Sequence, residues 1–110
     1  MKHKTNYDTM CPKFEGAFKI LGKRWNALII RTLLGGEHRF SELHAVIPAL
    51  SDRMLSERLR ELETEGIVLR KVFVEIPVRI EYSLSEKGKS LQPALEEIQQ
   101  WAETWHQQSN

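Results

Sequence analysis

The side chains with the clearest potential for chemistry lie between Ser51 and Gly66. At about 100° per residue, Arg53, Glu57 and Arg60 share one face of a helix. A guanidinium can donate two parallel hydrogen bonds to guanine O6 and N7, and a carboxylate can accept one from cytosine N4. Basic side chains dominate the first two-thirds of the stretch, and acidic side chains follow. This order is opposite to the one that the helix dipole favours, with acidic residues first and basic residues last. This order suits a helix whose N-terminal end approaches phosphates and base edges.

The same stretch contains the signals that would position this face. Ser51 is a favourable N-cap, and Gly66 permits the left-handed residue that ends many helices. Apolar residues at i, i+4 and i+7 form a stripe on the opposite side, namely Leu55, Leu59 and Leu62. An amphipathic core helix with a solvated charged face would show the same pattern.

Cys11 is the second candidate for chemistry. It precedes Pro12 at the expected start of a helix, where the dipole and unpaired N–H groups favour the thiolate and raise its reactivity, and Lys13 adds positive charge. We therefore interpret Cys11 as a candidate sensor of oxidants or electrophiles. A small residue packed in a subunit interface is the alternative. Since there is no second cysteine, a disulfide would have to join two subunits or a small thiol.

The sequence favours no catalytic or metal chemistry. Its four histidines have no metal-ligand spacing, and it has no paired-carboxylate site, nucleophile motif or phosphate-binding glycine loop. An enzyme is not expected, and no cofactor or metal is predicted. A lone cysteine suits a reducing compartment, and we see neither a signal segment nor a membrane-spanning run. These features predict a cytoplasmic protein.

Charge is distributed unevenly along the chain. The formal net charge is only +1, but residues 1–40 hold eight basic and three acidic side chains. From Ser85 onward there are two basic and four acidic side chains. Local potential rather than net charge steers a polyanion. The N-terminal part is therefore the expected positive side.

Periodicity predicts an α+β fold that is mainly α. Residues 1–10 are expected to be flexible, and residues 11–110 form one domain. Helices are expected at 12–21, at 23–34, and at 42–46 after a Ser41 cap. The second should bury a stripe of Trp25, Leu28, Ile29, Thr32 and Leu33. The third should point Leu43, Val46 and Ile47 inward. A turn at 48–50 leads into the stretch described above, and the two helices make a helix-turn-helix. Strands at 67–73 and 79–84 form a hairpin in the position of a wing.

A last helix follows the Ser85 cap, with either a kink at Pro93 or a restart near Gln92. Its apolar stripe exceeds what a small core needs, and dimerisation is the most plausible use. The alternative is that the stripe packs over the first helix of its own chain. The stripe comprises Leu91, Leu95, Ile98, Trp101 or Ala102, and Trp105.

The order and spacing of several motifs resemble those of HxlR-type winged helix-turn-helix transcriptional regulators, relatives of the MarR regulators. The matching segments are Cys11-Pro12, residues 21–25, residues 39–43, residues 50–55, residues 59–63 and residues 77–85, so the resemblance covers roughly residues 10 to 105. Lys23 stands where a second glycine is common in the family, Arg24 replaces the usual lysine, and Val78 replaces a frequent second proline.

The resemblance implies a homodimer, built by the N- and C-terminal helices, that binds a pseudo-palindromic operator in double-stranded DNA. It also points to Cys11 as a sensor. We lean towards a repressor, because one small domain has little surface left for recruiting polymerase. A winged helix that binds another protein through the same surfaces is the alternative.

The predicted DNA contacts come from four parts of the chain. Arg53 is the first choice for a base contact, and the wing residues would enter the minor groove. For each, a solvated surface position is the alternative. The set is Ser51, Arg53, Ser56, Glu57 and Arg60 of the 51–66 helix, with Lys23 and Arg39 on phosphates and Lys71 and Arg79 on the wing.

Overall fold

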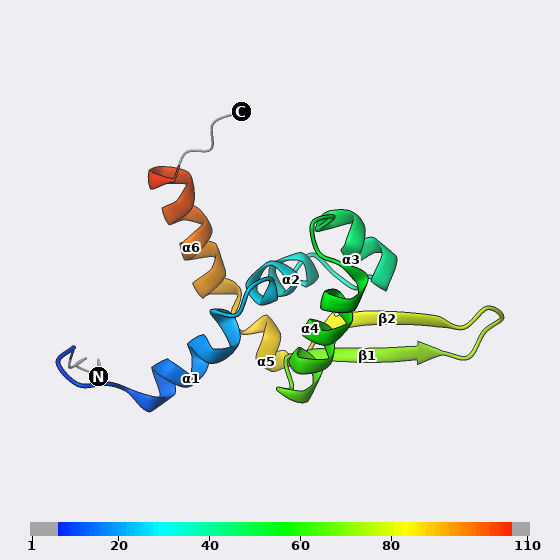
Figure 1. The fold of residues 1–110 in the computed structure, drawn as a ribbon, viewed down its shortest axis with the longest axis horizontal. Helices are drawn as coiled ribbons and strands as arrows, with labels where there is room; N and C mark the ends of the chain where they lie inside the picture. The colour runs from blue at the N-terminus through cyan, green and yellow to red at the C-terminus, as the bar shows by residue number, and fades with distance from the viewer. Residues whose placement is uncertain (1–6, 107–110) are drawn as a thin grey trace.

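The elements follow the predicted order (Figure 1). The computed structural model describes residues 7–106, so most of the flexible segment predicted at 1–10 lies outside the described residues. The elements are α1 (Pro12–Leu21), α2 (Asn26–Leu33), α3 (Phe40–Val46), α4 (Asp52–Thr64), β1 (Val68–Phe73), β2 (Arg79–Leu84), α5 (Glu86–Lys89) and α6 (Gln92–Trp105). No helix among them is long and apolar enough to cross a membrane.

Helix α4 has the ends and the buried face that its sequence predicts. The Ser51 hydroxyl accepts a hydrogen bond of 3.1 Å from the Met54 backbone N–H, which satisfies one donor of the first turn. Gly66, just beyond the helix, has a positive φ of 75°. The three leucines of the stripe are all buried. They pack with α2 residues Ile29, Ile30 and Leu33, and with Leu43, Ile47 and Leu50.

The hairpin directly follows α4 and extends away from the core (Figure 1). Strands β1 and β2 are antiparallel, with Val68 opposite Leu84 and Phe73 opposite Arg79. Beside the hairpin, His38 forms a two-way backbone bridge with Tyr82, through N–O distances of 3.0 and 2.8 Å. The α3–α4 helix-turn-helix and this hairpin make a winged helix-turn-helix, as predicted.

Two helix starts and two inward positions were predicted wrongly. Helix α2 begins at Asn26 rather than at residue 23, because residues 22–25 form a turn in which Trp25 has a positive φ of 81°. The burial phase shifts accordingly: Leu28 is 47% exposed, whereas Ile30 is buried. Helix α3 begins at Phe40, since the Glu42 carboxylate accepts from the Arg39 N–H and Arg39, not Ser41, is the N-cap. Val46 is also exposed.

The C-terminal helical region is broken into two helices. The Ser85 hydroxyl caps α5 by accepting from the Gly88 N–H at 3.1 Å, as expected. The chain then restarts at Gln92, so the alternative of a restart is confirmed and the kink is not. Pro93 falls in the first turn of α6, where its missing N–H costs no intrahelical hydrogen bond.

We predict opposite effects on stability for alanine at two glycines. A Cβ at Gly88 would lie 2.5 Å from the Ile67 carbonyl oxygen, so Gly88→Ala should lower the free energy of unfolding by about 1–3 kcal/mol. At Gly16, inside α1, no atom outside its chain neighbours and the backbone of the same helix lies within 4 Å of such a Cβ, and alanine should raise the free energy of unfolding by about 0.5–1 kcal/mol. Urea denaturation of both variants measures the difference, and equal effects would contradict it.

Candidate nucleic-acid interface

The exposed face of α4 presents the predicted residues around Arg53. The Arg53 side chain is 90% exposed, and its only ion pair among the described residues is a 3.6 Å contact between Nε and Glu57 Oε1. Glu57 and Arg60 are exposed beside it. A guanidinium this exposed keeps its donors available to a ligand, and Glu57 one turn later restrains its direction. The Ser51 hydroxyl already accepts from the first turn as a cap.

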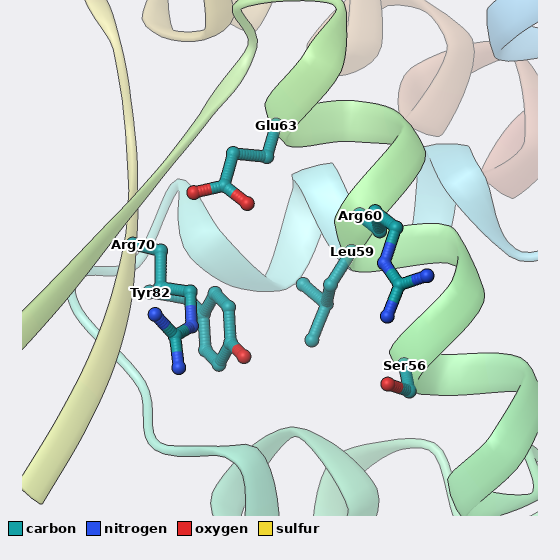
Figure 2. A pocket seen from close by; sticks show the side chains of 6 residues that line it. All are labelled: Ser56, Leu59, Arg60, Glu63, Arg70 and Tyr82. Carbon is teal, nitrogen blue, oxygen red and sulfur yellow. The ribbon is translucent and has the colours of Figure 1, made fainter.

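A groove of about 330 Å³ separates α4 from the hairpin (Figure 2). Ser56, Arg60 and Glu63 line it from the α4 side, and Arg70 with Tyr82 line it from the strands. Arg60 and Arg70 therefore provide positive charge from both sides. The sequence interpretation missed Arg70. The alternation of β1 could have found it, because Val68 faces the core and the residue two positions on lies on the same face.

The two basic residues predicted for the wing lie on the other face of the hairpin. Lys71, Phe73 and Arg79 share that face, since paired residues of antiparallel strands point the same way. The Arg79 guanidinium lies 4.0 Å from the Phe73 ring centroid, and its nitrogens lie 3.1 and 3.5 Å from carboxylate oxygens of Glu75 and Glu81. The Lys71 ammonium is also above Phe73, at 4.9 Å. A minor-groove role for Arg79 would have to break these contacts.

The two predicted phosphate contacts outside α4 and the wing are in different surroundings. The Lys23 ammonium lies 2.6 Å from Glu61 Oε2 on a flank of α4, so a phosphate would compete with this ion pair. Arg39 is exposed at the start of α3, and its backbone N–H donates to Glu42 at 2.7 Å. Arg39 is therefore exposed to solvent, as a residue that contacts a phosphate must be.

The ion pair on α4 has a consequence for acid stability. The hydrogen bond from Lys23 holds the pKa of the Glu61 carboxyl below its usual value of 4.5, and Arg58 adds to the effect. A carboxyl with a lowered folded-state pKa stabilises the fold above its unfolded pKa, and this contribution is lost as pH falls through the folded value.

We therefore predict that Glu61→Gln destabilises the protein at neutral pH by no more than about 1 kcal/mol, as expected of an exposed pair. The difference between wild type and Glu61→Gln should shrink as the pH falls below 4.5. Urea denaturation at pH 7 and at successively lower pH measures it. A difference that stays constant with pH would contradict the assignment.

Cys11 lies in the open at the N-terminal end of α1. It is exposed, occupies the N-cap position with extended backbone, and its side chain makes no capping hydrogen bond. No residue of α1 is buried within the chain. A reagent in solution can therefore reach the thiol, and the packing alternative would need a second subunit.

Sequence comparison places the chain in a known family. The HxlR-like helix-turn-helix family matches residues 20–110. The HTH-type transcriptional regulator YvaP of Bacillus subtilis (strain 168) is 60% identical over 100 residues, which are 91% of this chain and 93% of YvaP. YodB, an HTH-type transcriptional regulator of the same organism, is 53% identical over 96 residues, 87% of this chain and 86% of YodB.

Solved structures of family members have the same fold. The reduced form of YodB from B. subtilis superposes with a TM-score of 0.79 at 49% identity, covering 93% of this chain and all of that one. YodB has also been solved after diamide treatment and with a bound quinone. The redox regulator HypR in its oxidised form gives a TM-score of 0.83 at 35% identity, covering 89% of this chain and all of HypR. With its helix-turn-helix, its wing and these relatives, the chain belongs to the HxlR-like helix-turn-helix family and is an HTH-type transcriptional regulator.

Proposed function

We propose that the protein is a dimeric repressor that binds a specific operator with the exposed face of α4 and responds to electrophiles or oxidants through Cys11. The observation that carries the DNA-binding part is the set of exposed polar side chains on α4, with Arg53 90% exposed, beside a groove that adds Arg60 and Arg70. The order of charge along α4 directs its basic N-terminal half towards the DNA.

The base-reading residues of the proposal are Arg53 and Glu57, with Ser51, Ser56 and Arg60 on nearby phosphates or base edges. Arg70 joins them from β1 and Arg39 from α3. Lys71 and Arg79 remain proposed minor-groove contacts, although each has a partner within the chain. Lys23, predicted as a phosphate contact, is paired with Glu61, and we do not count it among the proposed DNA contacts.

The dimer rests on two uncovered apolar faces. Phe14 and Phe18 of α1 are 67% and 49% exposed, and their rings contact each other. Ile98, Trp101 and Trp105 of α6 are 54%, 62% and 74% exposed. Leu91 and Leu95 of the predicted stripe pack on the chain's own core, but the part from Ile98 onward is not covered by α1, and the two helices diverge (Figure 1). A second copy related by a twofold axis would cover both faces and present two α4 helices to two half-sites.

DNA binding is tested by fluorescence anisotropy with the DNA upstream of the protein's own gene and of its neighbours, at two salt concentrations. Specific binding that weakens steeply with salt is expected, because basic side chains displace counterions from phosphates. A protein-interaction winged helix has no reason to show this dependence. Equal, weak binding to all fragments would argue for that alternative or for a remote operator.

The sensor role predicts that an electrophile releases the protein from its operator through Cys11. The exposed thiol can form a covalent adduct, or two Cys11 thiols of a dimer can give up two electrons and two protons to an oxidant and form an intersubunit disulfide. That YodB has been solved with diamide treatment and with quinone supports these two reagents as probes. We expect diamide or a quinone to lower operator affinity of wild type at least about tenfold, as a regulatory coupling of typical size does.

The matched control is Cys11→Ser, which keeps a small polar residue at the N-cap and removes the thiol. Anisotropy titrations of this variant should show operator binding that neither reagent changes. Release of the Cys11→Ser variant by the same reagents would contradict the sensor role.

A further inference from the structure

A set of polar contacts joins the turn after α1 to one flank of α4. The Lys23 ammonium lies 2.6 Å from Glu61 Oε2, and Arg58 Nη1 lies 3.2 Å from Glu61 Oε1. Arg58 Nε also donates to the Arg24 carbonyl at 3.0 Å. The Arg58 side chain is only 12% exposed, and its contact with Glu61 is partly buried. One carboxylate on α4 is thus held by a cation from the α1–α2 turn and by one from its own helix.

Apart from these polar contacts, α1 packs on the core through Ile20 and Leu21 at its C-terminal end. None of its residues is buried, and it projects from the core with Cys11 at its far end (Figure 1). At its near end, Asn26 Nδ2 donates to the Ile20 carbonyl at 2.9 Å. Trp25 in the turn has a φ of 81°, a conformation that a large side chain holds only when its surroundings enforce it. Helix α1 is therefore an arm that is fixed at its C-terminal end, by Ile20 and Leu21 and by the turn between Gly22 and Asn26.

We propose that Lys23, Arg58 and Glu61 are positioning residues that lock this turn to α4, so that α1 and α4 move as one body. The inference rests on the proposed function, in which α4 reads the operator. It gives a role to the lysine that stands where the family often has a second glycine. A glycine at that position has no ammonium to reach Glu61, and the link would depend on Arg58 alone.

The geometry separates this role from direct DNA contact. Arg58 and Glu61 lie about 140° and 80° round α4 from Arg53, on the flank that faces the turn. The groove residues Ser56 and Arg60 lie on the other side of Arg53, next to the hairpin. The three positioning residues therefore act on the direction of α4 through the turn, not through contact with a base.

Hydrogen exchange of the full-length protein without DNA tests the link directly. Lys23→Gln and Glu61→Gln should each speed amide exchange about twofold to fivefold, the range for loss of an exposed ion pair, in both residues 18–25 and the α4 segment. The double variant should show no further increase over Glu61→Gln, because that change already removes the contact with Lys23. Lys19→Gln is the matched control, since Lys19 is exposed on α1 and has no ion pair within the described residues. Faster exchange in only one segment, or in neither, overturns the proposal.

Operator selectivity then tests the positioning role. Glu61→Gln removes a negative charge from a DNA-binding helix, which by itself would strengthen DNA binding. If Glu61 positions α4, the ratio of operator to random-sequence affinity of Glu61→Gln should fall at least about threefold. Lys23→Arg should keep the ratio of wild type. The salt dependence of DNA binding by Lys23→Gln should be unchanged. A direct phosphate contact would instead reduce the slope of that dependence by about 1. If wild type selects no operator, the proposed function fails while the exchange result stands; if Glu61→Gln selects as well as wild type, the positioning role fails.

Discussion

Arg53→Ala is expected to lower operator affinity by about 1–3 kcal/mol, which is about 5-fold to 150-fold, and to relax selectivity at one base pair. The side chain is 90% exposed and its contact to Glu57 is a long 3.6 Å, so the fold does not depend on it. Its free energy of unfolding should therefore stay within about 0.5 kcal/mol of wild type. Anisotropy titrations with the operator and with single-base variants of it measure both the loss and the position that is read.

Arg53→Lys is the matched control, because it keeps the charge and removes the planar fork that donates two hydrogen bonds. We expect the lysine variant to regain affinity for random DNA without regaining discrimination. Glu57→Gln should have a smaller effect, since the amide can still restrain Arg53. If Arg53→Ala weakens operator and random DNA by the same factor, Arg53 contacts a phosphate and another residue reads the bases.

The parts of the fold that were predicted correctly are those fixed by local signals. Helix α4 lies between Ser51, whose hydroxyl caps it, and Gly66 with its positive φ. Each signal acts within three or four residues, so the sequence alone contains it. Strand β2 was also bounded correctly at 79–84, where apolar and polar residues alternate.

Failures occurred where a distant contact or an unusual backbone decides. Nothing local predicts that Trp25 adopts a left-handed conformation, because tertiary packing enforces it, and the start of α2 moved by three residues in consequence. The apolar residues of this segment fit either helical phase. Leu28 was therefore predicted to be buried although it is exposed, and the buried Ile30 was not predicted. Arg58 and Glu61 show the same limit. Their partners are 34 and 38 residues away, and charge spacing along α4 cannot reveal them.

The predicted contact residues of α4 share one exposed face, whereas those of the wing lie on the face of the hairpin away from the groove. The α4 residues lie where helical spacing puts them, because the leucine stripe fixes the rotation of the helix. On the wing, basic residues were chosen by charge without fixing the phase of β1. Arg70 is the residue that faces the groove, whereas Arg79 lies on the other face against Phe73.

A chain that carries both Trp101→Glu and Trp105→Glu is expected to be monomeric and to bind the operator about 10²-fold to 10⁴-fold more weakly than wild type. Linked half-site contacts gain affinity because the second contact is intramolecular once the first has formed. Burying two unpaired carboxylates in an apolar interface costs several kcal/mol, far more than a surface ion pair contributes. Sedimentation equilibrium measures the mass, and anisotropy with the full operator and with a half-site measures the affinity.

Gln100→Glu is the control, since it adds a negative charge to the same exposed helix one residue away from the apolar stripe. It should leave mass and operator affinity close to those of wild type. The double tryptophan variant should still fold, because both side chains are more than 60% exposed and neither belongs to the buried core of α2, α3, α4 and the hairpin. The affinity of this variant for a half-site should equal that of wild type. This result would separate loss of the dimer from damage to the DNA-binding face of α4. A dimer that persists in this variant would remove α6 from the interface and leave the exposed phenylalanines of α1 as the surface that joins two copies.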